Sequence, residues 1–336
     1  MSTFPGQDLL NPEPSAPRLE PSPVAEEFPP PAHDQIQETI QNLAHPEDGT
    51  SADRPLFQSW YQPAPPRDER IPHLGHLLTL VVLTFFGLLC SGLLTEAALH
   101  FHLYGISTLE KAVDDTHYTL GNMVVLYLVP FVTGLFIFPL MWHKSFFTGL
   151  QWSAKTALHQ RWRLFSATCV CLVLAMIDGL VLPGPSNAPI EKLFQTPAQV
   201  WMLFAFGVTF APFFEEIAFR GFLLPSLCTA WDWSAEQFNH KPPPPLGENG
   251  HPQWSIPAMV AASILTSIPF AWMHAEQTGY SLGPFLLLVC VSLVLCWMRL
   301  ATRSLAASVL VHACYNFLLF SLMLLATSGF QHFDKK

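Results

Sequence analysis

The sequence predicts an all-α protein: a polytopic transmembrane helix bundle of seven to eight spans with a disordered Pro-rich N-terminal tail. Half of the residues are hydrophobic and only 12% are charged. The apolar residues come in runs close to the roughly 20 residues that a helix needs to cross a bilayer. The first seventy residues have a different composition from the rest, which sets them apart as a tail.

The tail, residues 1–70, is rich in proline and acidic. It holds 14 of the 31 prolines, and its twelve acidic residues and four arginines give it a net charge of −8, against −9 for the whole chain. Such a segment buries too little apolar surface to offset the entropy lost on ordering, so we expect disorder. No apolar core typical of a signal peptide lies near the N-terminus, so the first span is expected to remain as an anchor.

Seven apolar runs follow the tail, and a further helix around Ser107–Tyr118 would make eight. The segment Ala230–Trp254, rich in proline, is expected to be a connecting loop. Lysines and arginines favour the side of the tail, which predicts a cytoplasmic N-terminus. The predicted spans are Leu77–Leu94, Leu120–Trp142, Leu164–Leu182, Ala198–Leu224, Ile256–His274, Leu282–Met298 and Leu305–Ser328.

The fourth span contains three charged residues, Glu215, Glu216 and Arg220. A charge at the middle of a bilayer costs about 2.5–3.5 kcal/mol, so these side chains are expected to face a protein interior or a wet cavity. Glu216 and Arg220 are four residues apart and share a helix face, where they can pair. Glu215 points elsewhere, which leaves its carboxylate available.

Two later spans carry polar pairs at the same spacing. Phe270 precedes His274 by four residues, and His312 precedes Asn316 by four. One carboxylate, two imidazoles and a carboxamide from three helices could form a water-activating site. Glu215, His274 and His312 are also a ligand set for Zn²⁺, so metal-dependent and metal-free hydrolysis both remain open. His274 lies near the end of its span, so upright helices would place it several ångströms from the others in depth.

The order Glu-Glu-x-x-x-Arg, Phe-x-x-x-His, His-x-x-x-Asn resembles the CPBP family of intramembrane metalloproteases. That family comprises CAAX prenyl endopeptidases and the bacteriocin-processing, Abi-type and lysostaphin-resistance-like membrane proteins. The resemblance implies that Glu215 activates water with help from His274, and that His312 and Asn316 stabilise an oxyanion. It also implies that Glu216 and Arg220, with Phe270, support the site.

The resemblance implies a multi-pass integral membrane endopeptidase whose substrate is a membrane-associated protein or peptide. No nucleic-acid partner is expected. The predicted regions are the tail 1–70, N-terminal transmembrane helices over 71–190 and a CAAX-protease-like catalytic transmembrane domain over 191–330. Two other classes remain open: a non-catalytic immunity or scaffold protein of the same family, and a proton-coupled transporter. Against the transporter, the chain has no pair of matching halves.

Overall fold

The computed structural model describes residues 70–182, 196–245 and 253–326. Within these ranges the regular structure is entirely helical, which confirms the predicted fold class. The predicted tail, except for Arg70, lies outside the described residues.

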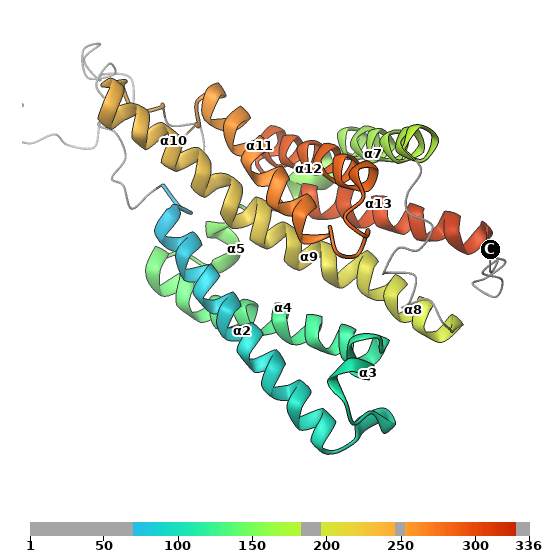
Figure 1. Cartoon of the computed structure of the whole chain (residues 1–336). Helices are drawn as coiled ribbons and strands as arrows, with labels where there is room; N and C mark the ends of the chain where they lie inside the picture. Colours follow the sequence, from blue (N-terminus) through green and yellow to red (C-terminus); the bar gives the residue numbers. More distant parts are fainter. Residues whose placement is uncertain (1–69, 183–195, 246–252, 327–336) are drawn as a thin grey trace, which may run out of the picture. The chain divides into compact units, whose positions relative to one another are not determined.

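Seven helical stretches of the described chain are long and apolar enough to cross a membrane, one for each predicted span (Figure 1). The chain is therefore an integral, multi-pass membrane protein. Six of these stretches are single helices: α2 (Leu74–His100), α4 (Thr116–Trp142), α7 (Arg161–Val181), α11 (Ile256–Met273), α12 (Leu282–Thr302) and α13 (Leu305–Ala326).

The optional eighth span is not formed in the described chain. The region around Ser107–Tyr118 holds α3 (Leu109–Val113), which has five residues, and then the first turn of α4. The segment between α3 and α4 ends at Asp115, the N-cap of α4. Its carboxylate accepts hydrogen bonds from the backbone N–H groups of His117 and Tyr118. The other short helices are η2 (Leu103–Gly105), α5 (Phe146–Gly149) and α6 (Ala154–His159).

The seventh stretch is one rod of 43 residues, Pro197–Asn239, drawn in yellow in Figure 1. It consists of α8 (Pro197–Ala205), the π-helical segment η4 (Phe206–Phe210), α9 (Ala211–Glu216), the π-helical segment η5 (Ile217–Leu223) and α10 (Leu224–Asn239). The expectation of a loop from Ala230 was therefore wrong by ten residues.

Polar contacts explain why the rod continues beyond its apolar part. Asp232 on α10 accepts hydrogen bonds from the backbone N–H and the hydroxyl of Ser255, the N-cap of α11. Glu236 pairs with Arg70 at 2.6 Å. The length of an apolar run indicates how much of a helix can lie in lipid. These polar contacts stabilise α10 beyond that length.

The rod contacts helices from both halves of the chain. On one side, η5 and α10 contact α2, which packs along α4. On the other, η4 and α9 contact α13, and α10 packs on α11. An apolar cluster of α4, α5, η5 and α13 residues, including Phe138, Leu150 and Phe222, joins the two sides. The predicted division between 71–190 and 191–330 stays a prediction, and contacts cross it.

Each π-helical segment lies just before a proline, Pro212 in α9 and Pro225 in α10. Proline has no N–H group and its ring crowds the carbonyl four residues earlier, which accounts for a widened turn at each point. A widened turn leaves backbone carbonyls without their usual helical donors. In this protein a side chain from another helix donates to one carbonyl in each segment.

Arg299 of α12 supplies the donor for η5. Its Nε donates to the carbonyl of Arg220 at 3.2 Å, and one terminal nitrogen donates to the carbonyl of Leu150, the C-cap of α5, at 3.3 Å. Arg299 is fully buried. It therefore connects three elements by satisfying carbonyls that would otherwise be buried without partners.

Replacement of Arg299 by methionine should lower stability by about 2–4 kcal/mol, because two buried carbonyls lose their donors. The measurement is thermal unfolding of the detergent-solubilised protein, followed by circular dichroism. Arg161→Met, at an exposed position on α7, is the matched control and should change stability by less than about 0.5 kcal/mol. Equal stability of the two variants would show that the carbonyls do not depend on Arg299.

Candidate active site

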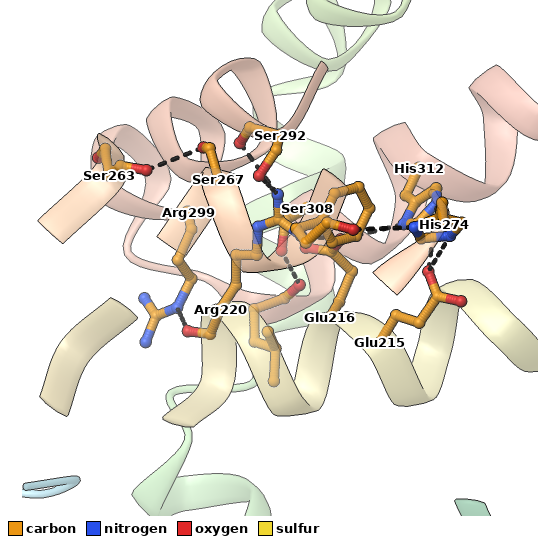
Figure 2. Close-up of polar contacts among 12 residues, drawn as sticks. Glu215, Glu216, Arg220, Ser263, Ser267, His274, Ser292, Arg299, Ser308 and His312 are labelled. Carbon is orange, nitrogen blue, oxygen red and sulfur yellow. Dashed lines mark hydrogen bonds and ion pairs between the residues drawn. The ribbon is translucent and has the colours of Figure 1, made fainter. Parts of the chain in front are cut away.

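The predicted ion pair forms at the centre of the described bundle. A terminal nitrogen of Arg220 donates to Oε1 of Glu216 at 2.9 Å, and both side chains are fully buried (Figure 2). The second terminal nitrogen of Arg220 donates to the hydroxyl and the carbonyl of Ser292 on α12, at 2.6 and 3.0 Å. The arginine is thus fixed to two helices and cannot turn towards Glu215 without losing these bonds.

Glu216 also binds one of the predicted histidines. Nδ1 of His312, on α13, lies 3.0 Å from the same oxygen, Oε1 of Glu216. Phe270 of α11 fills the space beside this cluster: its ring centroid is 4.5 Å from the guanidinium carbon of Arg220 and 5.8 Å from the ring of His312. The family resemblance implied a supporting role for Phe270 and Glu216, but it did not indicate these contacts.

Glu215 faces away from the ion pair and towards the two histidines. Its Oε2 lies 3.9 Å from Nε2 of His274 and 3.9 Å from Nε2 of His312. These side chains come from α9, the end of α11 and α13, and the carboxylate is 8% exposed. A gap of this length is too long for a direct hydrogen bond and fits one bridging water molecule.

The second nitrogen of each imidazole determines what that space can bind. Nδ1 of His274 lies 2.9 Å from the carbonyl of Phe270, and Nδ1 of His312 faces the Glu216 carboxylate. Because both partners are acceptors, a neutral ring carries its proton on Nδ1 and turns the lone pair of Nε2 to Glu215. Three acceptors therefore converge on one space, which suits water or a metal cation.

The depth mismatch expected for His274 does not separate it from Glu215. His274 is the C-cap residue of α11, directly after Met273, and Pro269 lies inside the same helix. The ring turns back along α11 towards the Phe270 carbonyl, which directs Nε2 to the carboxylate. Packing of the helices decides this convergence, and the sequence spacing did not reveal it.

Asn316 lies one helical turn beyond His312 on α13, but it makes a different contact. Its amide nitrogen donates to the carbonyl of Gly207 at 2.8 Å, inside the π-helical segment η4. Asn316 thus donates a hydrogen bond to a carbonyl of η4, as Arg299 donates one to a carbonyl of η5. An amide has two N–H groups, so one remains for another acceptor.

Three residues at or beside the site were missed by sequence reasoning: Tyr127, Ser292 and Arg299. Tyr127 of α4 donates its hydroxyl to Oε1 of Glu215 at 3.2 Å. Ser292 is the single hydroxyl residue of its predicted span, Tyr127 lies within a long apolar run, and Arg299 follows the predicted end of the sixth span. Polar residues at such positions are the signal that could have identified them.

The donor set of Glu215, His274 and His312 fits Zn²⁺ in its chemistry, since zinc prefers imidazole nitrogen and carboxylate oxygen. Neighbouring ligands of tetrahedral zinc are about 3.3–3.4 Å apart, so the 3.9 Å separations would have to shorten. Among the described residues, no group of three or more His, Cys, Asp or Glu side chains is close enough to hold a metal ion.

Comparison with known proteins gives one finding. Residues 197–318 match a family model described as type II CAAX prenyl endopeptidase Rce1-like. Searches of curated proteins and of solved structures returned no match. The matched segment begins with α8 and ends within α13, so it contains all three motifs and excludes α2, α4 and α7. Residues 197–318, here called the Rce1-like segment, are thus similar to this family.

Proposed function

We propose that this protein is an intramembrane endopeptidase that hydrolyses a peptide bond of a membrane-associated protein or peptide, with CAAX-type substrates as the first class to test. The observation that carries the proposal is the convergence of the Glu215 carboxylate with Nε2 of His274 and His312 in a buried space. The match to a family of CAAX prenyl endopeptidases supports the same reaction class.

In the proposed mechanism Glu215 is the general base. It removes a proton from a water molecule held between its Oε2 and the imidazoles, and the oxygen attacks the carbonyl carbon of the scissile peptide bond. The carbon–nitrogen bond then breaks, and Glu215 returns the proton to the departing amine. The free N–H of Asn316 is the candidate donor to the oxyanion. His312 turns the lone pair of Nε2 to this space, so in this mechanism its ring accepts a hydrogen bond from the water and does not donate to the oxyanion.

The Glu216–Arg220 pair serves this mechanism indirectly. Because Arg220 is bound to Glu216 and Ser292, it does not neutralise Glu215. Glu216 fixes the ring of His312 through Nδ1, which directs Nε2 to the reacting water. The pair therefore sets the geometry of the base and its partner, in line with the orienting role that the family resemblance implied.

A zinc ion would be held by Glu215, His274 and His312 and would supply Lewis-acid polarisation of the substrate carbonyl. The steps assigned above to the side chains do not require it. The cytoplasmic position of the N-terminal tail belongs to the proposal as well, and it rests on the distribution of loop charges.

Replacement of Glu215 by glutamine should lower kcat for a prenylated CAAX peptide by at least about 100-fold, because the amide cannot accept the proton. The assay is cleavage by purified protein in lipid vesicles, with peptide products identified by mass spectrometry. The change is nearly isosteric, so the variant should remain folded.

Glu96→Gln is the matched control, since Glu96 is an exposed carboxylate on α2, and it should cleave like the wild type. Full activity of a folded Glu215→Gln protein would overturn the proposed mechanism. Absence of cleavage in the wild type, with partner binding retained in Glu215→Gln, would favour a non-catalytic scaffold instead.

The zinc-chelating 1,10-phenanthroline should leave cleavage unchanged, because the proposed steps use only side chains and water. Its non-chelating isomer 1,7-phenanthroline is the control for direct inhibition by the aromatic compound. Loss of activity with the chelator alone, restored by added Zn²⁺, would identify the three side chains as metal ligands. Metal content of the purified wild type and of His312→Ala gives a second readout that does not depend on activity.

A further inference from the structure

Tyr127 is the polar contact of Glu215 that comes from outside the Rce1-like segment. It lies in α4, whereas the family match begins at residue 197. Its hydroxyl donates to Oε1 of Glu215 at 3.2 Å, and the other oxygen of the same carboxylate, Oε2, faces the two histidines. The two carboxylate oxygens therefore have different environments.

The ring of Tyr127 is held by aromatic side chains of the rod. It stacks on Phe206, at 6.2 Å between centroids and 9° between planes, and on Phe214, at 5.5 Å and 20°. Phe206 opens the π-helical segment η4 and Phe214 directly precedes Glu215. The phenol thus has a fixed position relative to the carboxylate, and such a preorganised donor loses little entropy when it makes its hydrogen bond.

A carboxylate on a flexible side chain can rotate, and a base works only while one oxygen faces the water. Arg220 donates a hydrogen bond to Glu216. The two imidazoles turn lone pairs towards Glu215 and donate no hydrogen bond to it. None of these groups therefore binds Oε1 of Glu215. Tyr127 does hold it.

We propose that Tyr127 is a positioning residue for Glu215: it binds Oε1 so that Oε2 stays directed at the reacting water between His274 and His312. This inference rests on the proposed role of Glu215 as the base. It makes the N-terminal helices part of the active site, although the family domain excludes them.

The test is Tyr127→Phe, which keeps the ring and its stacking and removes only the hydroxyl. With the prenylated CAAX peptide, kcat should fall by about 10–100-fold while KM stays within about twofold, because the base is misplaced and substrate contacts are intact. Tyr118→Phe is the matched control on the same helix, where the hydroxyl donates to the carbonyl of Leu103, and it should behave as wild type.

A second readout tests the contact without relying on catalysis. The apolar reagent dicyclohexylcarbodiimide modifies buried carboxyl groups through an oxygen, and mass spectrometry reports the modification of Glu215. Loss of the Tyr127 hydroxyl should speed this labelling by several-fold, because Oε1 of Glu215 is no longer occupied by a hydrogen-bond donor. Tyr118→Phe should label at the wild-type rate.

The outcomes separate this inference from the proposed function. Glu215-dependent cleavage with a wild-type kcat in Tyr127→Phe would overturn the positioning role and leave the endopeptidase standing. If the wild type cleaves no peptide, the proposed function fails, and the labelling rate alone decides: an unchanged rate overturns the contact, and a faster rate supports it.

Discussion

The buried ion pair between Glu216 and Arg220 is the interaction on which the site depends. Removing two charges from water is costly, and hydrogen bonds to other groups offset part of that cost. Here those groups come from other helices: Ser292 on α12 and His312 on α13, with Phe270 of α11 over the guanidinium. Oε2 of Glu216 and Nε of Arg220 have no hydrogen-bond partner among the described residues, so part of the cost remains. The contacts that are made gather three helices around the rod.

One consequence of this arrangement is that the two adjacent glutamates become chemically different. Glu216 binds an arginine and a histidine through one oxygen, whereas Glu215 makes no ion pair with Arg220 and faces imidazole lone pairs and a tyrosine hydroxyl. Neighbouring residues on a helix point about 100° apart, which lets one side chain stabilise the bundle while the next faces the reaction space.

The π-helical segments on either side of α9 tie this short helix to its surroundings. Each precedes a proline, and in each a carbonyl accepts from a side chain of a distant helix: Gly207 from Asn316 and Arg220 from Arg299. Arg299 and Tyr127 also connect the Rce1-like segment to residues before it, at Leu150 and on α4. The site therefore belongs to the whole described bundle and not to one segment.

The sequence by itself determined the seven spans, the ion pair and the candidate residues Glu215, His274 and His312, because apolar length and four-residue spacing are local properties of a helix. Only the tertiary structure decided that His274 reaches Glu215, that His312 binds Glu216, and that Asn316 donates to Gly207. It also decided the extension of the rod to Asn239 and the contact from Tyr127. These contacts join residues 23 to 166 positions apart in the chain, and helix packing, which no local pattern encodes, brings them together.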